Sequence, residues 1–109
     1  MTDLTTKKCA PCEGGVAPLQ AAAATTLLKQ LQADWSLSED AKSLHRAYKF
    51  RDFLRTMSFV NAVAHIANVE DHHPDLQVGY NYCRITYATH SIGGLSENDF
   101  ICAAKIDRL

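Results

Sequence analysis

Residues 71–90 read DHHPDLQVGYNYCRITYATH, and this stretch decides how the rest of the chain folds. Pro74 restricts the residue before it to extended backbone, so the helix upstream must end close to the histidine pair. The chain is expected to reverse at Gly79-Tyr80-Asn81, between a short strand at 76–78 and a long strand at 82–90. One face of the long strand is expected to carry Cys83, Ile85, Tyr87 and Thr89. The stretch therefore predicts a helix that leads directly into an antiparallel hairpin.

Upstream of the hairpin, helix and strand patterns alternate. A helix is expected at 19–33 and a longer one at 51–68, because apolar residues recur there at three- and four-residue steps. Two short strands are expected between these helices, at 35–38 and 44–50. The longer helix carries an apolar stripe that we expect to pack on the sheet. The stripe consists of Phe50, Phe53, Leu54, Met57, Val60, Ala64 and Ala67.

Downstream of the hairpin, the start of a last helix is well defined. Ser96 is a helix N-cap, and Asp99 at the N3 position completes a shorter variant of the capping box. This capping role would by itself account for the carboxylate of Asp99. Leu95 and Phe100 occupy the two positions of a hydrophobic staple. The helix is expected to continue to about Arg108.

The predicted order of elements is α-β-β-α-β-β-α, which indicates an α+β fold with a small four-stranded antiparallel sheet and three helices on one face. A chain of 109 residues suits one domain, which we place at 19–109. Residues 1–18 are predicted to be an irregular leader, an extended or mobile arm. The reason is that Pro11, Pro18 and paired glycines discourage regular structure there.

The composition excludes some classes of function. Eleven basic and twelve acidic residues give a net charge of −1, which lacks the one-sided positive field that nucleic-acid binding requires. No apolar run approaches the ~20 residues that span a bilayer, and residues 1–19 do not have the pattern of a signal peptide. We therefore expect a cytoplasmic protein with free thiols at its four cysteines. For Cys9 and Cys12, which form a C-x-x-C pair, metal binding and redox use stay open as alternatives.

Three of the five histidines lie on or beside the hairpin. The antiparallel return of the chain is expected to bring His90 close to His72 and His73. Imidazoles titrate near neutral pH, and a nearby carboxylate such as Asp71 or Asp99 raises their pKa and fixes their tautomer. The cluster therefore predicts acid–base chemistry on a small planar ligand.

Two alternatives stay open at this point. A zinc ion on His72, His73 and His90 would satisfy a three-histidine site, but adjacent side chains in extended backbone point apart. The histidine pair and Pro74 could also form a solvated turn. Covalent catalysis is disfavoured, because Cys83 and His90 are expected on opposite faces of one strand.

The same residues resemble the pattern of the pterin-4a-carbinolamine dehydratase family, also known as the dimerization cofactor of the hepatocyte homeodomain regulator. The pattern is His-His-Pro, five residues, an aromatic residue, nine residues, a His and later an Asp. In this chain it falls on His72-His73-Pro74, Tyr80, His90 and Asp99. Flanking segments that also match are Lys49-Phe50-Arg51-Asp52-Phe53, Gly94-Leu95-Ser96-Glu97 and Cys9-Ala10-Pro11-Cys12-Glu13-Gly14-Gly15. The resemblance covers about residues 9–108.

The resemblance implies an enzyme, a hydro-lyase that dehydrates 4a-hydroxytetrahydrobiopterin to the quinonoid dihydropterin and water in tetrahydrobiopterin recycling. It implies His72 as the principal acid–base residue, His90 as the second, and His73 as the residue that positions the ring. Four residues that flank these histidines would bind the polar edge of the pterin. They are Asp71, Ala88, Thr89 and Ser91. No metal, nucleotide or redox cofactor is implied.

The resemblance also implies a homodimer or homotetramer, built by sheet extension and helix packing. Recycling for an aromatic amino acid hydroxylase is the family's best-known task, and molybdopterin-related metabolism is the other pathway considered. A non-catalytic, coactivator-like interaction module of the same fold is the alternative function. One position departs from the family, which often has Glu four residues before the first histidine. Here Asn68 stands in that place. Asn68 and Asp99 would both support His72, but Asn68 would supply no charge.

Overall fold

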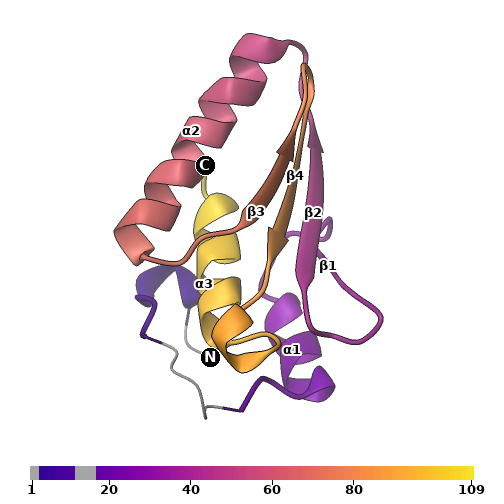
Figure 1. The fold of residues 1–109 in the computed structure, drawn as a ribbon, viewed down its shortest axis with the longest axis vertical. Helices are drawn as coiled ribbons and strands as arrows, with labels where there is room; N and C mark the ends of the chain where they lie inside the picture. Colours follow the sequence, from indigo (N-terminus) through magenta and orange to yellow (C-terminus); the bar gives the residue numbers. More distant parts are fainter. Residues whose placement is uncertain (1–2, 12–16) are drawn as a thin grey trace.

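The computed structural model describes residues 3–11 and 17–109 (Figure 1). Within these residues the chain forms three α-helices and one four-stranded antiparallel sheet, in the predicted α-β-β-α-β-β-α order. The helices are α1 (Ala21–Leu28), α2 (Phe53–Glu70) and α3 (Glu97–Ile106), with short 3-10 helices η1 (Leu4–Thr6) and η2 (His90–Ile92). The strands are β1 (Ser36–Leu37), β2 (Leu44–Lys49), β3 (Asp75–Val78) and β4 (Tyr82–Tyr87). The predicted α+β fold class is confirmed.

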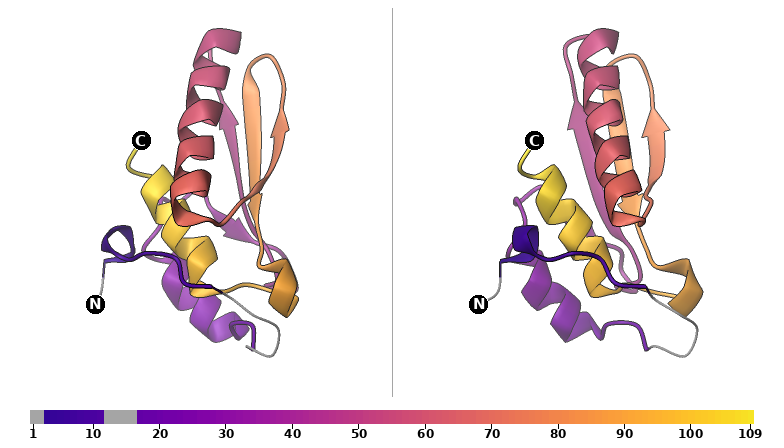
Figure 2. Two further views of the ribbon diagram at one scale, coloured as in Figure 1. Left: turned by 60° about the vertical axis from the view of Figure 1, so that its left-hand side comes forward. Right: turned by 90° about the vertical axis from the view of Figure 1, so that its left-hand side faces the viewer.

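The sheet has the strand order β1-β2-β4-β3, so β4 lies between β2 and the short β3. The predicted hairpin is present, with Asp75 paired to Thr86 and Val78 paired to Cys83. All three helices lie on the same side of the sheet, as the left view of Figure 2 shows. The residues of β4 share faces as predicted, and the face with Cys83 and Tyr87 is the inward one, because both are fully buried in the core.

The α2 segment buries only part of the predicted stripe, since Phe50, Val60 and Ala67 pack on the core while other members do not. Phe53 and Leu54, expected to pack on the sheet, are 52% and 75% exposed. The fully or nearly buried positions of α2 are Thr56, Val63 and Ala67. The physical reason lies at the helix start, where the Thr56 hydroxyl donates to the backbone carbonyls of Asp52 and Tyr80, 2.8 and 3.0 Å away. A satisfied threonine therefore occupies the inward position that the apolar pattern assigned to its neighbours.

The β4 strand is shorter than predicted. It ends at Tyr87, and His90 opens the 3-10 helix η2 instead of closing the strand. The cause is a tight loop in which Gly93 adopts a left-handed backbone (φ 71°) and Thr89 pairs with Gly94. Two helices also end earlier than predicted. The α1 helix ends at Leu28 instead of residue 33, and α3 ends at Ile106 instead of about Arg108.

The described part of the leader, residues 3–11, is packed on the domain. Leu4 is only 1% exposed and belongs to the main core. Lys7 pairs with Glu97 on α3 at 2.9 Å. Figure 2 shows this segment crossing over α3. Cys12 lies outside the described residues, and the division into a leader at 1–18 and a domain at 19–109 stays a prediction.

The N-terminus of α3 is built as predicted. Ser96 and Asp99 form the reciprocal capping box, and both staple residues, Leu95 and Phe100, are completely buried. Of the cysteines that the structure describes, Cys9, Cys83 and Cys102 are free thiols. None of the helices in the described ranges combines the length and the hydropathy that a membrane crossing needs.

Candidate active site

The position of His72 is fixed by the way α2 ends. Asp71 ends the helix in a left-handed conformation (φ 51°, ψ 44°), which aspartate tolerates better than most residues. The backbone N–H groups of Asp71 and His72 both donate to the carbonyl of Ala67. This turn directs His72 back under the helix toward α3, while Pro74 directly precedes β3.

His72 is held by a buried carboxylate. Its Nε2 lies 2.6 Å from Oδ1 of Asp99, which is completely buried. The other carboxylate oxygen, Oδ2, accepts from the Thr89 hydroxyl at 2.8 Å and from the Ser96 backbone N–H at 3.0 Å. Asp99 therefore performs both predicted roles, as the N3 residue of the capping box and as the partner of His72. The hydrogen bonds to Oδ2 hold the carboxylate in a fixed orientation toward His72.

The surroundings of His72 favour its charged form. Burial of the ring opposes protonation, but the hydrogen bond that His72 donates to Asp99 and the negative charge of Asp99 together outweigh burial, so the pKa of His72 is raised above its ordinary value. The ring of Tyr87 stacks on the imidazole, with 5.7 Å between centroids and 7° between the planes. His72 is therefore a rigidly oriented imidazole that is easily protonated near neutral pH.

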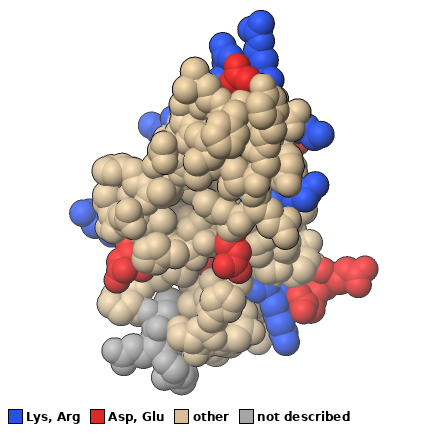
Figure 3. Space-filling view, turned by 45° about the horizontal axis from the view of Figure 1, so that its top comes forward, with Lys and Arg blue, Asp and Glu red and all other residues tan. Residues whose placement is uncertain are grey.

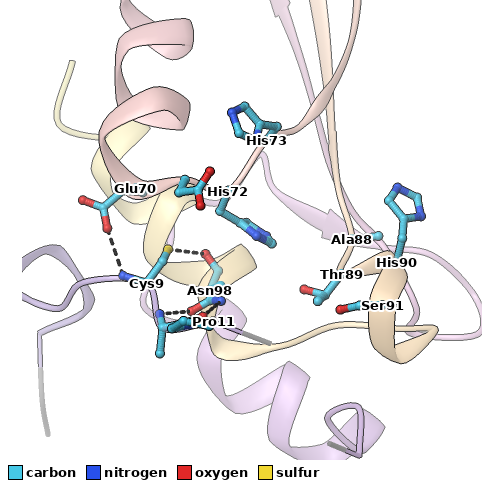
Figure 4. A pocket seen from close by; sticks show the side chains of 12 residues that line it. Cys9, Pro11, Glu70, His72, His73, Ala88, Thr89, His90, Ser91 and Asn98 are labelled. Carbon is cyan, nitrogen blue, oxygen red and sulfur yellow. Dashed lines mark hydrogen bonds between the residues drawn. The ribbon is translucent and has the colours of Figure 1, made fainter. Parts of the chain in front are cut away.

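The three histidines border one cavity of about 520 Å³, which is within the usual range for small-molecule sites (Figure 4). His73 and His90 are both exposed. In Figure 4 the rings of His72 and His73 come from the connection between α2 and β3 and point in different directions, and that of His90 comes from η2. The four residues expected to bind the pterin edge also line it. They are Asp71, Ala88, Thr89 and Ser91.

The histidines do not form the zinc site considered above. Among residues 3–11 and 17–109, no group of three or more His, Cys, Asp or Glu side chains is arranged to hold a metal ion. His72 already directs Nε2 at a carboxylate, whereas His73 and His90 lie on other sides of the cavity. The three histidines are therefore separate groups around one cavity.

Asn68 does not reach the site. Its position on α2 is exposed, and it is not among the residues that line the cavity. Glu70, two residues further along, lines the cavity instead. Its carboxylate accepts from the Cys9 backbone N–H at 2.9 Å and pairs with Lys105 at 2.6 Å. Burial opposes ionisation of Glu70, but the hydrogen bonds from Lys105 and the Cys9 N–H, together with the charge of Lys105, outweigh burial and lower the pKa of the carboxyl group.

Five residues of the cavity wall escaped the sequence reasoning. They are Cys9, Ala10, Pro11, Glu70 and Asn98. The only sequence signal for the first three was the likeness of the leader to the start of family members. Nothing in the local pattern shows that this leader lies against α3.

A second cavity, of about 600 Å³, lies over the outward-facing residues of the sheet and includes His45. Both ring nitrogens of this histidine already have partners. Nε2 lies 2.6 Å from the Ser43 hydroxyl, and Nδ1 lies 3.1 Å from the Thr86 hydroxyl. His45 is therefore less suited to proton transfer than the histidines of the first cavity.

The comparison with known families agrees with the geometry. The family model described as pterin 4 alpha carbinolamine dehydratase matches residues 17–109. The chain belongs to this family. Residues 1–16 of the leader lie outside the family model, but the relatives described next align with 98–99% of this chain and therefore with most of the leader.

Two bacterial relatives bear the name of the dehydratase family. A Nitrosomonas europaea protein is 56% identical over 107 residues, which is 98% of this chain and 93% of that protein. A Legionella pneumophila (strain Corby) protein is 54% identical over 108 residues, which is 99% of this chain and 96% of that protein.

Two solved structures share the dehydratase fold. A Brucella melitensis protein, described as a transcriptional coactivator/pterin dehydratase, has a TM-score of 0.78 and 31% identity, over 84% of this chain and 96% of that chain. A pterin dehydratase-like protein, described as a RuBisCO assembly factor in the alpha-carboxysome, has a TM-score of 0.60 and 22% identity, over 71% of this chain and 89% of that chain. The second likeness shows the fold alone.

Proposed function

We propose that this protein dehydrates a 4a-hydroxytetrahydropterin, with 4a-hydroxytetrahydrobiopterin as the expected substrate, by histidine general acid–base catalysis. The observation that carries the proposal is the 2.6 Å contact between His72 and the buried Asp99, at the edge of a cavity that His73 and His90 also line. Membership of the dehydratase family supports the choice of substrate class.

The chemistry needs one acid and one base. The substrate carries a hydroxyl group on C4a and a proton on the adjacent ring nitrogen. An acid protonates the hydroxyl group, and the C–O bond breaks with its electron pair leaving as water. A base removes the nitrogen-bound proton, and the electron pair of that N–H bond forms the new C=N bond of the quinonoid product.

The two roles suit different histidines. His72 is suited to donate the proton, because Asp99 stabilises its imidazolium form. His90 is exposed on η2 at the other side of the cavity, which suits a base that receives a proton and passes it to water. His73 then packs against the ring and holds it between them. Since both sites exchange protons with solvent after each turnover, the cycle needs no further cofactor.

A stopped-flow assay with chemically generated 4a-hydroxytetrahydropterin tests the proposal. Because the substrate dehydrates spontaneously, the signal is the acceleration that the protein adds. We expect the rate to rise in proportion to the concentration of protein and to saturate with substrate. The His45→Ala variant is the matched control, since it removes a histidine of the second cavity, and we expect it to match the wild type. A wild-type protein that adds nothing to the spontaneous rate would exclude the proposed activity.

The alternative function is a non-catalytic interaction module. One observation favours it. Phe53 and Leu54 at the start of α2 are largely exposed, and the ring of Phe53 stacks on Tyr80, itself 65% exposed, at 6.3 Å. Figure 3, in which this end of the molecule comes forward, shows a largely uncharged surface with Lys and Arg at its margin. Exposed apolar surface of this kind fits a partner or a second copy of the chain. A folded protein without dehydratase activity would favour this alternative.

The homodimer or homotetramer expected from the family stays a prediction. Sedimentation of the Phe53→Ser and Leu54→Ser double variant tests whether the exposed surface of α2 takes part in it. The pathway in which the pterin arises also stays a prediction, with tetrahydrobiopterin recycling the first choice.

A further inference from the structure

The leader forms one wall of the histidine cavity. Cys9, Ala10 and Pro11 line it together with the histidines. In Figure 4 Pro11 lies across the cavity from Thr89 and Ser91. The side chains of Ala10 and Pro11 are exposed and apolar, whereas the opposite side supplies hydroxyl and imidazole groups. A flat heterocycle with polar edges would meet polar groups on one side and apolar contact on the other.

Asn98 holds the leader in place by two hydrogen bonds. Its Oδ1 accepts from the Ala10 N–H at 3.0 Å, and its Nδ2 donates to the Ala10 carbonyl at 2.6 Å. The side-chain amide therefore pairs with the leader backbone as a neighbouring strand would. Asn98 is only 7% exposed and stands beside Asp99 in the first turn of α3. The same helical turn thus fixes both the partner of His72 and the leader.

Glu70 provides a second attachment from the other side of His72. It is the last residue of α2, and its carboxylate accepts from the Cys9 N–H at 2.9 Å. The pairing with Lys105 on α3, at 2.6 Å, fixes the orientation of the carboxylate, and the Glu70 side chain is only 6% exposed. An ionised acceptor makes the bond to Cys9 stronger than a bond between neutral groups.

A thiol contact lies beneath the same segment. Cys9 Sγ is 3.6 Å from Cys102 Sγ on α3 and 3.6 Å from the Asn98 carbonyl. Cys102 Sγ in turn lies 3.9 Å from the His72 carbonyl. The leader is therefore in contact with the elements that position His72, and a shift of the leader would change the shape of the cavity at that residue.

We propose that residues 9–11 are a fixed wall of the substrate site and that Asn98 and Glu70 are positioning residues that hold this wall. The inference rests on the proposed function and deepens it, because it assigns the contact with the apolar surface of the pterin to a segment outside the dehydratase family model. Substrate affinity then depends on the leader, whereas the proton transfers depend on the histidines.

The first part of the experiment measures the attachment without any activity. Amide hydrogen exchange by NMR should show the Cys9 and Ala10 N–H groups protected in the wild type. Asn98→Leu, which is close in size and makes neither hydrogen bond, should release the Ala10 amide. Lys7→Met is the matched control, because it removes the leader's ion pair with Glu97 outside the cavity. Unprotected amides in the wild type would overturn the proposal.

The second part separates binding from chemistry. Asn98→Leu and Pro11→Gly should each raise KM at least about fivefold with kcat changed less than about twofold, since the groups lost act on binding alone. Glu70→Ala should behave like Asn98→Leu. Glu70→Gln keeps an acceptor for Cys9 and should recover most of the affinity.

The outcomes distinguish the two proposals. A wild-type protein without dehydratase activity overturns the proposed function and this inference with it. An active wild type whose KM is unchanged in Asn98→Leu and Pro11→Gly overturns only the role of the leader. A KM that rises equally in Lys7→Met also contradicts it, because the effect would then follow loss of any leader contact.

Discussion

Replacement of Asp99 by Asn changes the proton affinity of His72 at constant side-chain size. In the native site one carboxylate oxygen faces His72 Nε2, and the other accepts from the Ser96 N–H and the Thr89 hydroxyl. A backbone N–H can only donate, so the amide oxygen of Asn must face Ser96. The amide NH2 group then faces His72, and Nε2 must accept a hydrogen bond, which only the neutral ring can do.

The size of the effect follows from the bond that is lost. A hydrogen bond to a charged group contributes about 1.5–3 kcal/mol, and one pKa unit corresponds to about 1.4 kcal/mol. The pKa of His72 in Asp99→Asn should therefore fall by about 1–2 units from its wild-type value, because burial of the ring is no longer opposed. If His72 acts as the acid, the dehydration rate near pH 7 should fall by about 10–100-fold.

An NMR titration of the His72 ring and the stopped-flow assay measure the two effects in the same samples. Asp34→Asn is the matched control, since it makes the same change in a side chain that is 78% exposed, and both quantities should stay at wild-type values. A His72 that titrates in Asp99→Asn as it does in the wild type would refute this account of its environment.

Three further predictions concern stability and the departure from the family. The raised pKa of His72 contributes stability that is complete below the unfolded-state value of about 6.5 and is lost as pH rises through the folded-state value. The gap in free energy of unfolding between wild type and Asp99→Asn should therefore narrow from about pH 6 to pH 9 in urea titrations, and a gap that widens would contradict the sign. Asn68→Glu introduces the residue that the family often has, at an exposed position outside the cavity. The turnover rate should therefore stay within about twofold of wild type, and the pKa of His72 should not change. A large gain in activity would show that position 68 acts on the site. Thr56→Val removes the buried bond to the Tyr80 carbonyl and should cost about 1–3 kcal/mol in the same titrations, and a variant as stable as wild type would show that this bond does not select the buried face of α2.

The parts of the fold that could be predicted are those that neighbouring residues determine. The Ser96–Asp99 capping box, the staple of Leu95 and Phe100, and the turn at 79–81 each depend on residues a few positions apart. The sequence pattern predicts that the strand continues to residue 90, because side chains alternate through Thr89, but β4 ends at Tyr87. Periodicity records which way side chains point, and it does not record where hydrogen bonding between strands ends.

The parts that could not be predicted depend on contacts between distant residues. At the start of α2 the inward position belongs to Thr56, whose partner Tyr80 lies 24 positions away, whereas apolar periodicity predicts Phe53 and Leu54 there. The leader reaches Glu70 across 61 positions and Asn98 across 88. All three predicted histidines border one cavity, because a hairpin brings its two ends together whatever the loop between them does. Their roles in catalysis stay predictions.

The most direct test of the central claim is the dehydration rate of His72→Ala and His90→Ala, measured by stopped flow beside the wild type and the His45→Ala control. Far-UV circular dichroism establishes that each variant is folded. If these histidines transfer the protons, each variant should lose at least about 100-fold of the acceleration while His45→Ala keeps it. Near wild-type rates in both His72→Ala and His90→Ala would contradict the claim.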